Sequence, residues 1–246
     1  MKARDRIKQT ALVGALTTAI LSQASFAHTR LEVPTLPEAT RAFNNVVIGH
    51  GCGTNPVIGT SVVFPDGVTS TITVDGQPHA GPLTDFVSNW GPSISVVQSE
   101  ALFSLGGVKR SPEGKIVGFW AGGGGGLSTD MIGPVPFRVN AVTIEPGSCA
   151  VSVRFEVSIV DVCEITPIGD LRADGVAGLW TPHDLGTPYD RAESGGPASL
   201  TITRDLTTNP LPFDCGDGVA VEVRSSAEQI NRDMPVYIDG TQIWPQ

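Results

Sequence analysis

Methionine, tyrosine and basic residues are scarce in this 246-residue sequence, and each shortage excludes a class of function. Beyond the first residue, methionine occurs only as Met131 and Met234, which is too few for a methionine-rich Cu(I) site. Tyrosine occurs only as Tyr189 and Tyr237, so the sequence does not predict a tyrosine-rich face for binding a polymer. The 16 Lys and Arg against 25 Asp and Glu give a formal charge of −9, which repels nucleic acid and anionic lipid.

Sequence motifs of common catalytic sites are absent as well, since no HExxH, GxSxG or CxxC occurs. The glycine run 122–126 continues as Leu127-Ser128-Thr129 and lacks the Gly-Lys-Ser/Thr of a phosphate-binding loop. We expect it to form a flexible hairpin loop, because glycine tolerates most backbone angles. His183-Asp184 has no serine in a nucleophile-elbow context to complete a triad, so hydrolytic chemistry is not expected.

The first 27 residues have the three parts of a secretory signal peptide. Four basic residues lie within residues 2–8, an apolar stretch follows at 11–21, and small residues lead up to Ala27. The apolar stretch is shorter than the roughly 20 residues that a membrane-spanning helix needs. We therefore predict cleavage between Ala27 and His28 and a periplasmic or extracellular protein, with no insertion into the membrane after cleavage. The signal peptide carries four basic residues and Asp5, so its loss removes a net charge of +3 and takes the chain from −9 to −12.

The remaining residues predict an all-β protein. The sequence has 29 Gly and 19 Pro, and short runs rich in Val, Ile, Thr and Phe recur between turn residues, which is typical of a β-sandwich with long loops. The expected strands are 29–33, 43–50, 59–64, 68–74, 101–106, 115–120, 135–144, 149–162, 198–203 and 218–224. Short helices are expected only at 36–42 and 226–231, and long loops at 75–93 and 164–197.

The stretch 149–163 gives the clearest strand, because apolar and polar residues alternate along it. This period of two predicts a half-buried antiparallel strand with Val153, Phe155 and Ile159 facing inward. The stretch 43–50 puts His50 on the inward face in the same way. The chain contains four cysteines, and an even number in an exported chain predicts two disulfides. Their spacing leaves all three pairings open.

Two histidines are the strongest candidates for a chemical site. After cleavage His28 would be the N-terminal residue, and its α-amine and ring Nδ1 could chelate one metal ion. His50 lies 22 residues later, next to Gly51-Cys52, and could supply a further nitrogen. Nitrogen donors at fixed positions suit Cu(II) and Ni(II), and Cu(II) has the highest affinity in the divalent series. His50 could instead be a structural histidine bonded to the backbone, and His28 could follow the cleavage site by accident.

The order of several short motifs resembles the YcnI-like family of secreted copper-binding proteins (the DUF1775 domain). The resemblance begins with His28-Thr29-Arg30-Leu31-Glu32, a proline-containing spacer and His50-Gly51-Cys52. It continues with 64–67 (FPDG), 89–91 (NWG), 120–123 (WAGG), 136–139 (PFRV), 155–164 ending in Cys-Glu, Trp180 and 197–200 (PASL). It covers residues 28–203, which we take as one domain, and leaves 204–246 as a C-terminal β extension packed on that domain.

The resemblance implies an immunoglobulin-like sandwich with a mononuclear Cu(II) site, one ion per chain. His28 would be the chelating ligand and Trp180 the aromatic residue that caps the site, although Trp180 could equally be a core residue. His50 takes the place expected for a carboxylate, with Glu32 and Glu164 as the alternatives. The resemblance also matches Cys52 and Cys163 to cysteines of the family, which implies the pairs Cys52–Cys163 and Cys149–Cys215.

The expected function is copper storage, buffering or delivery without catalysis, in exchange with a membrane copper transporter or a copper chaperone. Two other functions fit the same residues. An N-terminal histidine with a second histidine is also the ligand set of copper monooxygenases that attack polysaccharides. In a metal-free sandwich for adhesion or assembly, both histidines would be structural.

Overall fold

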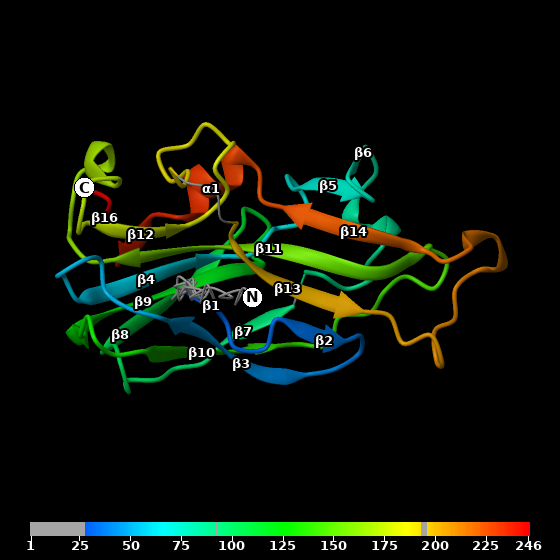
Figure 1. Ribbon diagram of the computed structural model, residues 1–246, viewed down its shortest axis with the longest axis horizontal. Helices are drawn as coiled ribbons and strands as arrows, with labels where there is room; N and C mark the ends of the chain where they lie inside the picture. The colour runs from blue at the N-terminus through cyan, green and yellow to red at the C-terminus, as the bar shows by residue number, and fades with distance from the viewer. Residues whose placement is uncertain (1–27, 92, 193–195) are drawn as a thin grey trace, which may run out of the picture.

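The computed structural model describes residues 28–91, 93–192 and 196–246, and the predicted signal peptide, residues 1–27, lies outside this part of the chain. The predicted all-β sandwich is confirmed, because two sheets face each other across a single large apolar core (Figure 1). Within the described residues, no helix is both long enough and apolar enough to cross a membrane.

The smaller sheet has four antiparallel strands and carries the first described residues. Its order is β1-β3-β10-β7, so β3 lies between the first strand and β10. The strands are β1 (Arg30–Leu31), β3 (Ala42–Ile48), β10 (Gly133–Val139) and β7 (Ile94–Val96).

The larger sheet has ten strands and is organised around the long strand β11 (Ala150–Val162). Its main path is β6-β5-β14-β11-β4-β9-β8, with β12 and β13 also paired to β11 and with β2 paired to β13. The other strands are β2 (Thr35–Pro37), β4 (Val57–Val63), β5 (Thr71–Val74), β6 (Gln77–His79), β8 (Leu105–Arg110), β9 (Ile116–Leu127), β12 (Ala177–Trp180), β13 (Ala198–Thr203) and β14 (Val219–Arg224). The sheet is mixed rather than purely antiparallel, because β11 pairs with β14, and β13 with β2, in parallel.

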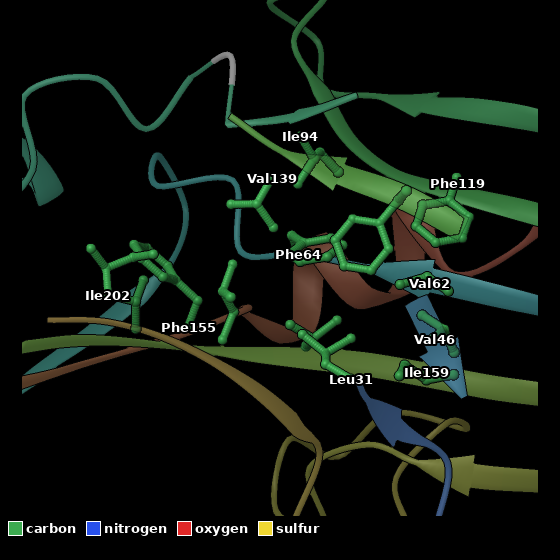
Figure 2. Close-up of a cluster of buried hydrophobic side chains, with 14 of the residues drawn as sticks. Leu31, Val46, Val62, Phe64, Ile94, Phe119, Val139, Phe155, Ile159 and Ile202 are labelled. Atoms are coloured by element: carbon green, nitrogen blue, oxygen red, sulfur yellow. The ribbon is translucent and has the colours of Figure 1, made fainter. Parts of the chain in front are cut away.

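The core between the sheets is built from the alternating positions of the strands. Figure 2 shows Leu31, Val46 and Val139 of the smaller sheet pointing toward Phe155 and Ile159 of the larger one. Phe155, Ile159 and Val46 are completely buried. The periodicity of 149–163 therefore identified the inner face of β11 correctly.

The outer face of β11 differs from the prediction, because its second half is buried on both sides. Val160 and Val162 belong to a second apolar cluster with Tyr189, Met234 and Trp244. The C-terminal segment provides this cover through α1 (Ala227–Asp233), β15 (Val236–Ile238) and β16 (Thr241–Trp244). Residues 204–246 thus supply both a strand of the larger sheet, β14, and a layer over its outer face.

Several local expectations are wrong, and strand pairing explains the three that follow. Residues 36–42 are not a helix, since β2 pairs with β13 there and β3 begins at Ala42. The glycine run 122–126 is not a hairpin loop but part of β9, with a register shift opposite β4. The expected loop 164–197 contains β12, which pairs with β11.

The helix expected at 226–231 is confirmed as α1, capped by the side chain of Ser226. The other helical turns are the short 3-10 helices η1 (Leu83–Asp85), η2 (Ile168–Asp170) and η3 (Phe213–Cys215).

Candidate functional site

Trp180, the last residue of β12, brings the two candidate histidines together. Its ring centroid lies 4.8 Å from that of His28 and 6.4 Å from that of His50, with the rings edge to face in both cases. The register of β12 on β11 sets its position, because Trp180 lies opposite Ile159 and Gly178 lies opposite Asp161. Trp180 is half-buried and packs on the edge of the main core, so it is both a core residue and a neighbour of the histidines.

The strand β1 brings His28 to this indole. Arg30 lies opposite Val47 and Leu31 opposite Val46, so the antiparallel register runs from β1 back past the end of β3, toward His50. Thr29 is 3% exposed, and its hydroxyl donates to a carboxylate oxygen of Asp161. The residue after His28 is therefore anchored in the sandwich, which restricts His28 to the neighbourhood of Trp180.

His50 reaches the indole by another route, and its predicted position in an inward-facing strand is wrong. Strand β3 ends at Ile48, and His50 is an exposed residue beyond it, because Gly49 and Gly51 break the alternation. Its Nδ1 contacts the carbonyl oxygen of Gly51. When Nδ1 carries the proton and donates it there, Nε2 presents its lone pair and can act as a ligand or an acceptor.

Both predicted disulfides are confirmed. The Cys52–Cys163 disulfide joins the segment after His50 to the residue that follows β11. The backbone of Cys52 also pairs with that of Asn55 in an isolated antiparallel β-bridge. This bond fixes the loop that carries His50 beside the end of β11. Cys149–Cys215 joins the start of β11 to η3, at the other end of that strand.

The carboxylate that organises the site is Asp161, which the sequence reasoning missed. The indole Nε1 of Trp180 donates to Oδ2 of Asp161 at 2.8 Å, and the Thr60 hydroxyl donates to Oδ1 at 3.2 Å. With the Thr29 hydroxyl, three donors converge on one side chain that is 2% exposed. A signal was available, since Asp161 continues the inward-facing series of Phe155 and Ile159, where a carboxylate needs partners.

Burial raises the pKa of Asp161 to about 6. The three donors and the positive charge that His50 can carry oppose this shift, because they stabilise the carboxylate form. Desolvation dominates all the same. Around neutral pH the site therefore holds a buried negative charge next to two imidazoles.

Gly178 leaves the space that the indole uses. A Cβ atom at this position would lie 3.2 Å from Nε1 of Trp180 and 3.5 Å from Cβ of Asp161. A side chain here would therefore push the indole away from its acceptor. The absence of a side chain at Gly178 therefore leaves room for the hydrogen bond between Trp180 and Asp161.

The two carboxylates proposed as alternative ligands, Glu32 and Glu164, have other partners. Both side chains are exposed. Glu32 accepts from the Asn45 side chain, and Glu164 accepts from the Asn55 side chain at 2.7 Å. Neither is among the groups that surround Trp180 in the described contacts.

The side chains of the described residues contain no cluster of three or more His, Cys, Asp or Glu that would hold a metal ion by themselves. The donors near Trp180 are two imidazoles, with Asp161 bonded behind the indole. A nitrogen-preferring ion fits this donor set only when a further donor joins it. The α-amine of His28, once freed by cleavage, would be such a donor.

A pocket of about 380 Å³ opens next to the site. His50, Asp161 and Trp180 are among its lining residues, together with Arg172 and Arg191. The guanidinium carbon of Arg191 lies 4.7 Å from the centroid of the Trp180 ring. A small molecule in this pocket would therefore touch the same indole as both histidines.

Comparisons with known proteins give no functional assignment. No family model matches the chain, and no curated protein matches it. Among solved structures, one described as an uncharacterized protein from Nocardia farcinica with an immunoglobulin-like fold matches at 12% identity and a TM-score of 0.41. The match covers 72% of this chain and 98% of that one.

Proposed function

We propose that the mature protein binds one Cu(II) ion through the amine and Nδ1 of His28, with His50 as a further nitrogen ligand. The observation that carries the proposal is the convergence of both histidines on Trp180. The two residues are 22 positions apart in sequence and reach the indole through different elements. A single histidine beside a tryptophan would be weak support for a metal site, whereas two imidazoles next to the same indole place two nitrogen donors close together.

The proposal requires export and cleavage after Ala27, since only then does His28 carry a free amine. The two disulfides are typical of proteins in oxidising compartments. Amine and ring of one residue then form a chelate, in which the first bond raises the effective concentration of the second donor. Both donors bind as free bases, so protons compete with copper and binding weakens in acid.

Asp161 supports this arrangement without binding the ion. It holds Thr29 on one side and the Trp180 indole on the other, and so fixes the residue next to His28 and the ring that both histidines contact. Positioning of ligands by a second layer of hydrogen bonds is a general feature of metal sites in proteins. Bound copper supplies a cation that can be stored, buffered or passed to a membrane copper transporter or a copper chaperone.

Copper titration of the mature protein tests the proposal. We expect one Cu(II) per chain, and His50→Ala should weaken binding by about tenfold because one nitrogen ligand is lost. The electron paramagnetic resonance spectrum should change as well. His183→Ala is the matched control, since His183 is an exposed histidine without an assigned role in the site.

The outcomes separate the three functions. Absence of copper binding would leave the metal-free sandwich. Oxygen consumption with a reductant and a polysaccharide would favour the copper monooxygenase over storage or delivery. Equal binding by the His50→Ala and His183→Ala variants would remove His50 from the ligand set.

A further inference from the structure

The pocket beside His50 has two positively charged side chains that form no ion pair among the described residues. Arg154, Arg224 and Arg232 each form an ion pair with Asp or Glu. Arg172 and Arg191, which both line the pocket, form none among the described residues. In a chain with a formal charge of −9, two such arginines at one cavity are a local reversal of charge.

Arg191 is held in place and still lacks an acceptor. Its guanidinium lies over the Trp180 ring, and its backbone N–H donates to the carbonyl of Pro182 at 3.1 Å. The Nη1 atom is buried and has no hydrogen-bond partner among the described residues. Buried donors without a partner are rare in native proteins, because desolvation without a new hydrogen bond costs free energy. Because Nη1 is closed to solvent, a ligand in the pocket would bind the other N–H groups of this half-buried guanidinium, for which no hydrogen bond is described.

Arg172 is oriented by neutral groups. Its Nε donates to the carbonyl of Asp190 at 3.0 Å, and its Nη2 donates to the carbonyl of Thr187 at 3.4 Å. Backbone carbonyls fix the plane of the guanidinium but leave its formal charge uncompensated. The two arginines thus present one half-buried and one exposed cation to the same cavity.

The negative groups at the pocket do not cancel these charges. Asp161 lines the pocket, but its oxygens already accept from Thr29, Thr60 and Trp180. Asp174 also lines the pocket and is exposed to solvent, so water screens its charge. An anion that enters can therefore bind the accessible part of the Arg191 guanidinium.

We propose that this pocket binds a small organic carboxylate, with Arg191 as the main donor and Arg172 as the second cation. A guanidinium presents two parallel N–H groups that match the two oxygens of a carboxylate. The lining also includes apolar residues, Leu171, Ala177 and Leu179, which suit a short hydrocarbon chain better than a fully hydrated anion. A volume of about 380 Å³ lies within the range of small-molecule pockets, so the cavity has room for a small organic ligand. The site goes beyond copper binding and does not depend on it.

Calorimetric titration of the copper-free mature protein with sodium propionate tests the proposal. We expect saturable binding to one site, about tenfold or more weaker in Arg191→Gln, because a charge-assisted hydrogen bond is lost. Arg172→Gln, which leaves Arg191 over Trp180, should weaken it by a smaller factor. Arg154→Gln is the matched control and should bind like the unchanged protein, since Arg154 pairs with Glu222 elsewhere.

Inorganic phosphate at equal ionic strength is the second arm, because it shares the affinity for guanidinium groups but has no hydrocarbon chain. Propionate binding that exceeds phosphate binding supports the proposal. Tighter binding of phosphate would overturn the carboxylate assignment. Absence of saturable propionate binding, or equal affinity in Arg191→Gln and Arg154→Gln, would overturn the site. Copper titration without either anion tests the metal site separately.

Discussion

At the scale of single residues, Asp161 explains most of the site. A carboxylate on the inner face of a sandwich would be costly without partners, and here three donors from β4, β12 and the segment before β1 converge on it. The same bonds connect the residue after His28 to the indole that both histidines contact. The sequence contained this residue in a core-facing series, but alternation alone predicts which face a residue occupies and not which donors meet it.

The pKa of Asp161 gives a prediction about stability in the copper-free protein. Because burial raises this pKa to about 6 from the usual 3.8, the folded state holds a proton that the unfolded state has lost over this interval. The free energy of unfolding contributed by Asp161 is therefore highest below pH 3.8 and falls as the pH rises through 6.

Asp161→Asn should remove that pH dependence while keeping an oxygen acceptor for Trp180. Relative to the unchanged protein, the variant should gain about 2 kcal/mol in the free energy of unfolding between pH 4.5 and pH 7. Urea unfolding at the two pH values measures the gain. A difference between the proteins that is the same at both pH values would contradict the assigned shift.

At the scale of elements, the sequence predicted best those strands along which apolar residues recur at every second position. The stretch 198–203 matches β13 at both ends, and 149–162 and 218–224 match β11 and β14 to within a residue. Strand β12 was missed because its four residues are all half-buried and show no alternation. Only its pairing with β11 makes it a strand, and such pairing between distant segments leaves little signal in the local pattern.

The sequence predicted several residues of the site but not the tertiary contacts among them. His28, His50 and Trp180 were singled out from the sequence, and the structure places them next to one another. The orientation of His50 was not predictable from alternation, because glycines flank it on both sides. The carboxylate assignment to Glu32 or Glu164 rested on the resemblance, while the buried Asp161 depends on tertiary contacts.

Removal of the two disulfides should separate stability from site geometry. Replacing either pair with serines should lower the free energy of unfolding by about 2–4 kcal/mol, because each bond restricts the unfolded chain. Loss of Cys52–Cys163 should also weaken copper binding, since this bond holds the loop of His50. Loss of Cys149–Cys215, at the other end of β11, should leave copper binding unchanged. Thermal unfolding of both variants measures the loss of stability, and copper titration measures the affinity. An equal loss of copper affinity in the two variants would contradict the account of the His50 loop.

Gly178→Ala tests the space for the indole within β12. The added Cβ would crowd Nε1 of Trp180, so we expect a weaker bond to Asp161 and a loss of about 1 kcal/mol in stability. The indole N–H resonance of Trp180 should shift in the nuclear magnetic resonance spectrum. Gly147→Ala is the control, because a Cβ at that position meets no atom within 4 Å. An unshifted resonance in Gly178→Ala would argue against the contact.

At the scale of the whole molecule, the C-terminal segment is tied to the sandwich by a buried lysine. The Nζ of Lys109 in β8 donates to the carbonyl oxygens of Met234 at 3.2 Å and Pro235 at 2.6 Å. Burial lowers the pKa of Lys109 to about 7, although the nearby charge of Asp233 opposes the shift. The layer that covers the outer face of β11 therefore depends on a cation in an apolar setting.

The lowered pKa of Lys109 predicts the opposite pH dependence to that of Asp161. Between pH 7 and pH 10.5 the unfolded state binds more protons at this residue, so the free energy of unfolding contributed by Lys109 rises with pH. Lys109→Met should remove this rise. Denaturant unfolding at pH 7 and pH 9.5 compares the two proteins, and an identical increase in both would contradict the shift.

The central claim is that the residue at the mature N-terminus binds the metal, and one added residue tests it most directly. A protein with a single glycine before His28 keeps both imidazoles and the whole fold but moves the amine out of chelating position. If the account is correct, competition titration with Cu(II) at neutral pH gives one tight site in the mature protein and an affinity about 10²- to 10⁴-fold lower in the extended one, since the gain in effective concentration is lost. Equal affinity in the two proteins would show that copper does not bind at the amine of His28.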